Sequence, residues 1–443
     1  MIERIVKRDG RIVPFNREKI TFAILQAAVA VGGRDRETAA GVTDEVIRML
    51  EERKAGDSYP TVEEVQDLVE KALIERGHAR TAKAYIVYRY EHALKRAGKK
   101  SLTYSPDNIP YSKLWEALSW AVDNGAVTLK QIGDTIRAGK IRDLVRDAEA
   151  FYHQELDKAA EKLLERLDEI KMIIIAGPSS SGKTTTTIKI GERLKLAGYS
   201  LVPINVDHYF LDLEQHPKDS GGDFDFETPQ ALDLSSINRD LVRLLQGEKI
   251  EIPYYNFKTG RKEGTSGKLQ IGEREIILID SLHGLYPEMT ADIPADKKFR
   301  FYIETLSQVK DRNRHFIRWA DIRLLRRMVR DMQFRNYSPK QTIRHWHYVR
   351  RSELRYIVPR LREADVIVNS FLTYELPVMK HRLGRFFPEF IAGFKHDPER
   401  ADALERAVRV SEIFEEIPAW QDEEVVPEDS LLREFIGGSA YRY

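Results

Sequence analysis

The spacing of hydrophobic and polar residues changes several times along the chain, and each change predicts a different element. Ile2–Val6 and Ile12–Phe15 alternate around an Asp-Gly pair, which predicts a β-hairpin because Asp-Gly tolerates the positive φ angles of a tight turn. The spacing then becomes helical over Arg17–Val31, Arg36–Glu52, Val62–Gly77 and Ala79–Arg96. The first hundred residues are therefore predicted to form a hairpin followed by a small helical bundle.

The middle of the chain is a polar stretch followed by three segments with helical spacing. Residues 98–110 are polar and rich in turn formers, which predicts a linker. Apolar residues then recur at helical intervals over Tyr111–Val122, Val127–Ile136 and Ile141–Ile170. None of these segments carries an evident catalytic motif, so we interpret residues 98–170 as a helical connector that transmits movement or contacts another subunit.

Short β-branched runs alternate with helical stretches in the remainder of the chain. Four runs predict strands of a mainly parallel sheet: Met172–Ala176, Ser200–Val206, Glu275–Asp280 and Ala364–Asn369. Helical spacing lies over Ile188–Leu196, Asp233–Leu245, Ala320–Arg335 and residues 397–417. This alternation predicts an α/β fold, with a hairpin-like, aromatic-rich stretch at residues 250–261.

Composition narrows the classes of function. The chain has 443 residues, of which 42% are hydrophobic, so two or three domains with sizeable cores are expected. Lys and Arg (71) balance Asp and Glu (70), so the net charge indicates neither nucleic acid nor an acidic membrane as a partner. The absence of cysteine excludes disulfides, thiolate zinc sites and a cysteine nucleophile. With no signal peptide and no long apolar stretch, we expect a soluble cytoplasmic protein that does not enter a membrane.

A phosphate-binding motif lies between the first predicted strand and its helix. Residues 177–184 read GPSSSGKT and match G-x-x-x-x-G-K-[ST], and the flanking elements argue against a Gly/Ser loop that fits by chance. Glycines let the backbone wrap a phosphate, loop N–H groups point at it, and the helix N-terminus adds a favourable dipole. Lys183 would reach the β- and γ-phosphates of ATP, and the Thr184 hydroxyl would face Mg²⁺. The predicted ATP-binding residues of the loop are Gly177, Ser179, Ser180, Ser181, Gly182, Lys183, Thr184 and Thr185.

Two acidic residues stand at the ends of predicted strands. Asp207 follows Ser200–Val206, and Asp280 closes Glu275–Asp280. In an open α/β sheet the carboxyl ends of the strands face the ligand crevice, so both side chains are expected beside the phosphate loop. Asp207 is a candidate base or metal partner, and Asp280 would hold Mg²⁺ directly or through water.

Arginines gather on one face of the predicted helix Ala320–Arg335. Four of them recur at i, i+3, i+4 and i+7: Arg323, Arg326, Arg327 and Arg330. Fixed cations of this kind stabilise the negative charge that spreads over a phosphoryl group during transfer. A solvated basic face is the simpler alternative. A nucleic-acid surface is a third interpretation, which the balanced net charge argues against, and it would comprise Arg314, Arg318, Trp319, Arg344, Trp346, Tyr348, Arg350 and Arg351.

The N-terminal segment carries motifs that recur together in one known module: Val6-Lys7-Arg8-Asp9-Gly10, Phe15, Lys19-Ile20 and Ala82–Arg89. With these motifs, residues 2–93 resemble the ATP-cone, an allosteric nucleotide-binding module of ribonucleotide reductases and their regulators. The resemblance implies a regulatory nucleotide, and the cations Lys7, Arg8 and Lys19 near a hairpin and a helix start suit a triphosphate. A solvated basic face on a structural bundle is the alternative.

Three further motifs accompany the phosphate loop: Asp207–Phe210, Phe226–Asp233 and Pro253–Phe257. With them, residues 171–383 resemble the uridine kinase and phosphoribulokinase group of P-loop kinases, and most closely the uridine–cytidine kinases. The resemblance implies that Asp207 is the catalytic base and that Glu227 helps to bind the ribose. It also implies that aromatic residues contact the acceptor: Phe210, Tyr255 and Phe257.

The same resemblance assigns roles along the arginine helix and beyond it. It implies substrate contact for Arg323, and nucleotide contact and catalysis for Arg326. It places Arg330 and Arg335 in a closing lid, and Arg330 would also contact the nucleotide. Gln341 stands where the family has a substrate-binding Gln.

Two positions depart from the family pattern. Family members that accept uridine carry a His soon after the Pro-x-Tyr-Asp-Phe motif, whereas Thr259–Arg261 contains none. Asp280-Ser281 replaces the usual Glu-Gly, which keeps a metal-binding carboxylate on a shorter side chain. The missing His leaves three functions open: a nucleoside kinase, a kinase of another hydroxyl such as a sugar or pentose phosphate, and a nucleotide sensor without turnover.

We therefore predict transfer of the ATP γ-phosphoryl group to a nucleoside hydroxyl, with Mg²⁺ as cofactor and Asp207, Lys183 and Arg326 as catalytic residues. The expected partners are a small-molecule acceptor, a regulatory nucleotide at the ATP-cone and further copies of the chain, but not nucleic acid. The predicted parts are an ATP-cone over residues 1–97, a helical connector over 98–170, a P-loop kinase domain over 171–395, and a C-terminal helix and tail over 396–443.

Overall fold

The computed structural model describes residues 2–6, 12–33, 35–52, 59–86, 89, 109–218, 224–397 and 400–442. The chain divides into two compact units, Met1–Val127 and Thr128–Tyr443, and each is described by itself. The boundary at residue 127 lies inside the predicted connector, and the domain limits at residues 97 and 170 remain predictions. No helix within the described ranges is both long and apolar enough to cross a membrane.

The first unit is an antiparallel hairpin followed by helices, as the sequence predicts. Val6 pairs with Ile12 across the hairpin. Its elements are β1 (Arg4–Val6), β2 (Ile12–Pro14), α1 (Arg17–Ala30), α2 (Arg36–Glu52), α3 (Val62–Glu75) and α5 (Tyr111–Asp123). Residues 79–86 are also helical, and most of the remaining helix predicted up to Arg96 lies outside the described residues.

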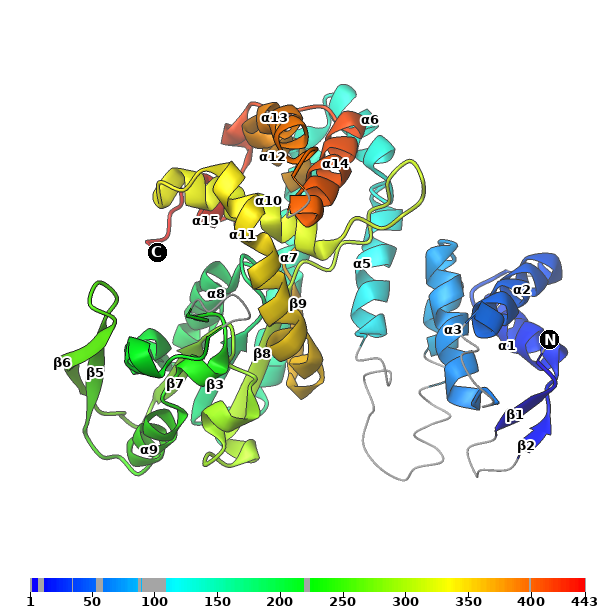
Figure 1. The fold of residues 1–443 in the computed structure, drawn as a ribbon. Helices are drawn as coiled ribbons and strands as arrows, with labels where there is room; N and C mark the ends of the chain where they lie inside the picture. The colour runs from blue at the N-terminus through cyan, green and yellow to red at the C-terminus, as the bar shows by residue number, and fades with distance from the viewer. Residues whose placement is uncertain are drawn as a thin grey trace. The chain divides into compact units, whose positions relative to one another are not determined.

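The second unit is built on a five-stranded sheet with the order β4-β7-β3-β8-β9 (Figure 1). All neighbouring strands pair in parallel, which confirms the predicted α/β fold class. Every residue of the central strand β3 is buried, as expected for a parallel sheet with helices on its faces. The strands are β3 (Met172–Ala176), β4 (Ser200–Ile204), β7 (Glu275–Asp280), β8 (Lys298–Glu304) and β9 (Val366–Asn369).

Strand β8 is the one that the sequence pattern does not reveal. Its residues Lys298 and Arg300 interrupt an apolar run, so the run lacks the uniform hydrophobicity of a buried strand. Local partners satisfy both charges: Lys298 Nζ donates to the carbonyl oxygen of Thr290 (2.8 Å), and Arg300 Nε donates to Asp365 Oδ2 (3.0 Å).

Helices pack against the sheet and against one another. Helix α7 packs against β9 and α8, and α8 packs against β3, β4 and β7. Helix α10, which carries the arginines, packs against α11, α12 and α15. The helices are α6 (Leu129–Arg137), α7 (Ile141–Leu164), α8 (Lys183–Leu196), α9 (Leu234–Leu245), α10 (Trp319–Phe334), α11 (Pro339–Ser352), α12 (Glu375–Leu383), α13 (Phe387–Phe394), α14 (Ala401–Glu416) and α15 (Arg433–Ile436).

The aromatic-rich stretch 250–261 belongs to a two-stranded antiparallel hairpin, as its sequence suggests. Strand β5 (Ile250–Asn256) pairs with β6 (Arg261–Leu269). This hairpin stands beyond the end of the sheet that carries β4 and β7 (Figure 1). Tyr255 and Phe257 therefore come from a hairpin outside the main sheet, whereas Phe210 follows strand β4.

Candidate active site

The loop between β3 and α8 has the backbone conformation that its glycines were expected to allow. Gly177 has φ +150°, and a Cβ atom there would lie 2.3 Å from the carbonyl oxygen of Ile303. Gly182 has φ +89° and caps the N-terminus of α8. Ser180 also has a positive φ of 59°. Because both close approach and left-handed geometry are required, the two glycines cannot be replaced without strain.

Lys183 lies at the first position of α8 and turns back into the loop. Its Nζ donates to the carbonyl oxygens of Gly177 (3.0 Å) and Pro178 (3.2 Å). Burial lowers the pKa of Lys183, and the nearby Asp280 carboxylate opposes that change. The ammonium group is therefore held at the mouth of the loop, close to the first-turn amides that would face a phosphate.

The two strand-end acids converge at one edge of the sheet. Asp207 lies in a short 3₁₀ turn after β4, where its N–H donates to Asn205 Oδ1 (3.0 Å). Burial raises the pKa of Asp207. Burial also raises the pKa of Asp280 to about 6, with the Lys183 charge opposing and the Asp207 charge adding to the increase. Adjacent pairing of β4 with β7 explains the convergence, because both strands end on the same side.

The donors at this edge fit a divalent cation that is also bound by a nucleotide. Asp280 Oδ2 accepts from the Thr187 hydroxyl (3.4 Å), which places the carboxylate against the first turns of α8. Thr184 is exposed on the same turn. Within the described ranges, no three His, Cys, Asp or Glu side chains gather closely enough to hold a metal by themselves. One carboxylate and one hydroxyl suit Mg²⁺, which takes most of its ligands from phosphates and water.

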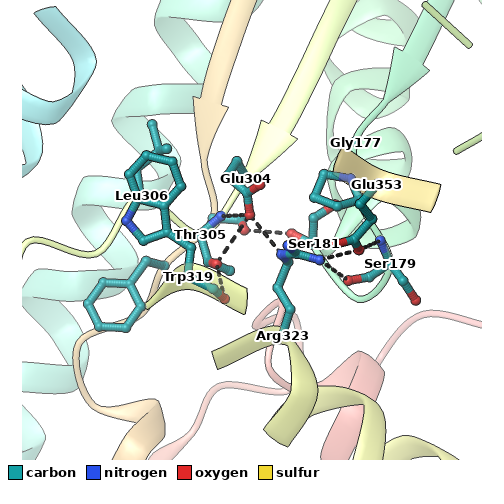
Figure 2. Close-up of polar contacts among 12 residues, drawn as sticks. Gly177, Ser179, Ser181, Glu304, Thr305, Leu306, Trp319, Arg323 and Glu353 are labelled. Atoms are coloured by element: carbon teal, nitrogen blue, oxygen red, sulfur yellow. Dashed lines mark hydrogen bonds and ion pairs between the residues drawn. The ribbon is translucent and has the colours of Figure 1, made fainter. Parts of the chain in front are cut away.

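Arg323 is fully buried and braces the loop. Its Nη1 donates to the carbonyl oxygen of Ser179 (3.1 Å) and, together with Nη2, to the Glu353 carboxylate (2.5 and 3.0 Å). Its Nε forms an ion pair with Glu304 (2.9 Å). Glu353 Oε1 in turn accepts from the N–H of Ser179 (3.1 Å). Figure 2 shows this network between the loop, the end of β8 and Arg323.

Arg326 is buried in a second network one turn further along α10. Its Nε and Nη2 donate to the two oxygens of Glu375 (2.6 and 2.8 Å). It also donates to the carbonyl oxygens of Ser370 (2.6 Å) and Ser181 (3.4 Å). The predicted contacts of Arg323 with substrate and of Arg326 with nucleotide stay predictions, but in this structure both guanidinium groups are engaged with carboxylates and loop carbonyls.

The outer arginines of α10 share one acidic partner, Asp331. Arg327 Nη1 donates to the Ser179 hydroxyl (3.1 Å), and its Nε donates to Asp331 (3.3 Å). Arg330 and Arg335 also pair with Asp331, at 3.4 and 3.6 Å. Burial lowers the pKa of Arg330, and the neighbouring Arg335 lowers it further. The predicted cluster thus has two fully buried members and an outer group that shares one acid.

Aromatic rings gather where the acceptor was expected. Phe210 contacts Tyr255 (5.5 Å between ring centroids) and Phe257 (5.7 Å), so the structure brings the three predicted aromatic residues together. His216 stacks on Phe210 at 5.6 Å. Tyr255 is buried, whereas Phe257 is 60% exposed. The group therefore presents the exposed ring of Phe257 next to the buried ring of Tyr255.

The other two predicted acceptor residues occupy different environments. Burial raises the pKa of Glu227, with Arg327 opposing, and the carbonyl oxygen of Glu227 accepts from the Ser352 hydroxyl. Gln341 is exposed at the start of α11, where its Oε1 accepts from the N–H (2.9 Å) and hydroxyl (2.8 Å) of Ser338. The Gln341 side chain therefore caps a helix, a role that is typical of the Ser-x-x-Gln pattern at residues 338–341.

Of the predicted regulatory cations, one is described. Lys19 is exposed near the start of α1. Lys7 and Arg8 lie outside the described residues. Arg89, which belongs to a motif of the N-terminal resemblance, pairs with Asp67 (2.6 Å) and Glu70 (2.7 Å), so its described contacts are structural.

Several residues at the site escaped the sequence prediction. The sequence contained a signal for Glu304, since it ends an apolar strand as Asp280 does, but the charged residues of β8 obscured it. No local motif marks the remaining ones. They are His216, Glu353, Glu375 and Glu434, of which Glu434 bonds Thr185.

Comparisons with known proteins match two parts of this chain to families. Residues 3–94 match the ATP cone domain, and residues 172–377 match the phosphoribulokinase/uridine kinase family. A uridine kinase of Deinococcus deserti is 28% identical over 198 residues, which cover 44% of this chain and 86% of that protein. A vitamin B12-dependent ribonucleoside-diphosphate reductase of Thermoplasma acidophilum is 35% identical over 112 residues, 24% of this chain and 14% of that protein.

A solved structure is also similar to part of this chain. It is that of a possible uridine kinase from Bacillus stearothermophilus, with a TM-score of 0.33 and 15% sequence identity over 49% of this chain and 98% of that one. The two family matches confirm the resemblances that the sequence motifs indicated. The chain therefore carries an ATP cone domain followed by a domain of the phosphoribulokinase/uridine kinase family.

Proposed function

We propose that the second unit is an ATP-dependent phosphotransferase that moves the γ-phosphoryl group of ATP to a nucleoside hydroxyl, in the first instance the 5′-hydroxyl. The observation that carries the proposal is the meeting of Lys183, Asp207 and Asp280 at the mouth of a glycine-shaped loop. A phosphate loop alone would suit a sensor. A carboxylate placed beside it as a base favours transfer, because a sensor has no proton to remove.

The proposed chemistry assigns one task to each group. Asp207 takes the proton of the acceptor hydroxyl, and its raised pKa makes it a stronger base than an aspartate with the usual pKa. Lys183 and the loop amides hold the phosphates. Asp280 and Thr184 would hold Mg²⁺, which neutralises phosphate charge when bound. Arg330, on the outer side of α10, would approach the transferred group as the site closes.

The buried arginines have a positioning role in this proposal. Arg323 and Arg326 bond the carbonyl oxygens of Ser179 and Ser181, so they hold the loop from behind. Their charges are already balanced by Glu353 and Glu375. A loop whose carbonyls are tied back presents its N–H groups forward, which is the arrangement that a phosphate needs.

The acceptor would meet the aromatic group. We propose that a nucleoside base stacks on the exposed ring of Phe257 and that Glu227 faces the ribose. One observation favours a second candidate, a sugar or pentose phosphate acceptor. The positions after Phe257 contain no His, and Arg261 is instead engaged with Glu214 (2.7 Å).

The ATP cone domain is proposed to bind a second nucleotide and to change activity or assembly, which is a coupling between two sites. Lys19 is the described cation that would contact the triphosphate. Replacing Lys19 with alanine should weaken the response of the kinase to added nucleotide without changing turnover in its absence. An unchanged nucleotide response would contradict a regulatory role for this residue.

A transfer screen tests the proposed reaction. The full chain is incubated with Mg²⁺-ATP and nucleosides, deoxynucleosides, sugars or sugar phosphates, with Asp207→Asn as the blank. A phosphorylated nucleoside that is absent from the blank supports the proposal. A product with sugars alone would keep the mechanism and change the acceptor. Turnover no faster than background hydrolysis across all acceptors would contradict it and favour the sensor.

A further inference from the structure

The C-terminal segment, residues 426–442, places a carboxylate on the phosphate loop. Thr185 donates to Glu434 Oε2 from both its N–H (3.1 Å) and its hydroxyl (2.8 Å). Glu434 lies on α15, almost 250 residues after the loop, and is only 8% exposed. The two partners are therefore brought together by tertiary folding alone.

The donors that Glu434 takes are the kind that bind phosphate. Thr185 lies in the first turn of α8, where N–H groups have no partner inside the helix and the dipole favours an anion. The charge of Glu434 also acts on Lys183, since it opposes the lowering of the pKa of that lysine by burial. An acidic group thus already stands among the cationic and N–H groups of the loop, where a nucleotide phosphate would need to bind.

Glu434 differs from the other carboxylate on this loop. Glu353 accepts from the N–H of Ser179, but Arg323 (2.5 Å) and Arg350 neutralise it. Among the residues that the structure describes, no basic group forms an ion pair with Glu434. Arginines therefore neutralise the charge of Glu353, whereas the charge of Glu434 is stabilised by the N-terminus of α8. An acid that is stabilised by the helix N-terminus competes there with any other anion.

Apolar packing sets the position of Glu434. Leu431 is fully buried against Gly182, since a Cβ atom on that glycine would come within 2.4 Å of Leu431 Cδ1. The buried ring of Phe435 lies 5.3 Å from the Arg326 guanidinium group. The neighbours of Glu434 on both sides thus contact the loop and the arginine helix. The segment is seated at the same place where the nucleotide is proposed to bind.

Polar contacts also hold the C-terminal segment in place. Asp429 pairs with Lys189 on α8 (2.7 Å), and Ser430 bonds the hydroxyl of Tyr374 (3.0 Å). Beyond Glu434, Gly437 and Gly438 have φ of +86° and +70°. These ties do not involve the phosphate donors of the loop. Glu428, an exposed acid of the same segment whose side chain takes no part in these ties, provides a matched control.

We propose that the C-terminal segment is an internal ligand of the phosphate loop, with Glu434 in the place of a nucleotide phosphate, so that ATP binds only when Glu434 withdraws. The inference rests on the proposed function, because it concerns the ATP site of that reaction. A protein whose site is open in a fraction f of molecules shows an apparent dissociation constant raised by 1/f, so closure of about nine-tenths of the molecules weakens ATP binding about tenfold.

The test is a titration of the full chain with a fluorescent ATP analogue and Mg²⁺. The component that disappears in Lys183→Ala is assigned to the phosphate loop, which separates it from binding at the ATP cone domain. Glu434→Gln keeps an oxygen for the Thr185 N–H and removes the charge, so it should tighten that component about tenfold. Glu428→Gln should leave it unchanged. In the double variant Lys183→Ala, Glu434→Gln the component should be absent.

Three results discriminate between the ideas. Equal or weaker binding in Glu434→Gln, with an unchanged melting temperature, would show that Glu434 is a structural cap and would overturn the inference. No Lys183-dependent component in either protein would contradict the proposed function itself. If Glu434→Gln does not fold, hydrogen exchange of the wild-type chain decides: saturating Mg²⁺-ATP should speed exchange at residues 430–436, and unchanged exchange there would overturn the inference.

Discussion

The phosphate end and the acceptor end of the same site are built in different ways. At the phosphate end, Arg326 and Glu375 are both fully buried and joined by two hydrogen bonds. At the acceptor end, Phe257 is 60% and Phe226 43% exposed. Phosphates of ATP are the same in every turnover, so fixed donors serve them, whereas an acceptor must enter and leave. On the proposed function, the buried half would hold ATP and the more exposed half would admit the acceptor.

The largest expected effect concerns Asp207, where the two ends meet. Asp207→Asn keeps the shape of the side chain and removes the base, so kcat should fall by about 10²–10⁴-fold. The measurement is initial rate at saturating ATP and acceptor. A loss of less than about tenfold would mean that another group takes the proton.

The pH profile sharpens the same prediction. Asp207 acts as a base only when ionised, and burial raises its pKa. The rate of the wild-type enzyme should therefore rise with pH along an acidic limb that lies above the usual range of an aspartate. This limb should vanish from the residual activity of Asp207→Asn.

The second prediction tests the rigidity of the phosphate end. Glu375→Gln leaves the buried Arg326 without its full countercharge, which should lower the free energy of unfolding by about 3–5 kcal/mol. Urea denaturation measures the change. The control is Glu423→Gln, which breaks a pair with the partly exposed Arg382 and should cost about 1 kcal/mol or less. Equal losses in the two variants would contradict the contrast in burial.

The third prediction concerns His283, which follows β7 and is buried beside Tyr356. Burial lowers the pKa of His283 to about 4. Its folded pKa lies below its unfolded value, so the unfolded chain takes up the proton first as the pH falls. Stability should therefore decrease from about pH 6.5 to about pH 4, by about 3 kcal/mol from this group.

Thermal unfolding across this pH window, compared between wild type and two variants, tests the assignment. His283→Gln should flatten the decrease, because it removes the group that titrates. His315→Gln should leave the slope intact, since the side chain of His315 is 80% exposed. An unchanged slope in His283→Gln would show that another buried group carries the pH dependence.

The smallest expected effect is at the acceptor end. Phe257→Ala removes an exposed ring that is proposed to stack on the acceptor, which corresponds to about 0.5–1.5 kcal/mol, or an increase in acceptor KM of about two- to tenfold. The KM for ATP should not change. Phe22→Ala, which removes a similarly exposed ring from the first unit, is the matched control. A change in the KM for ATP instead would break the division of the site into two ends.

Elements whose sequence pattern is local were predicted, whereas an element that depends on distant partners was missed. Strand β3, the loop and α8 follow one another directly, and their glycines and apolar run predict the observed conformation. The pairing of β1 with β2 was likewise predicted, from the alternation on either side of an Asp-Gly pair that itself lies outside the described residues. Strand β8 escaped prediction because its buried Lys298 and its partly buried Arg300 are acceptable only with Thr290 and Asp365 beside them.

The candidate site divides along the same line. Helical spacing predicted the arginine cluster of α10, and strand ends predicted Asp207 and Asp280. The sequence did not predict which acids pair with these arginines. Arg323 pairs with Glu353, 30 positions further along the chain. Arg326 pairs with Glu375, 49 positions further along. A sequence with 70 acidic residues offers many equivalent partners. The order of the strands and the packing of α10 decide among them.

By itself, the sequence determined the features whose physical cause lies within one turn or one strand. These include the phosphate loop, because glycine geometry, a lysine and a helix start act over eight residues. Only the tertiary structure decided which partner each charged side chain contacts. The clearest case is Glu434 on Thr185, a contact across 249 positions that no local pattern encodes. Electrostatic and apolar contacts act through space, so their partners follow from the fold and not from their distance along the chain.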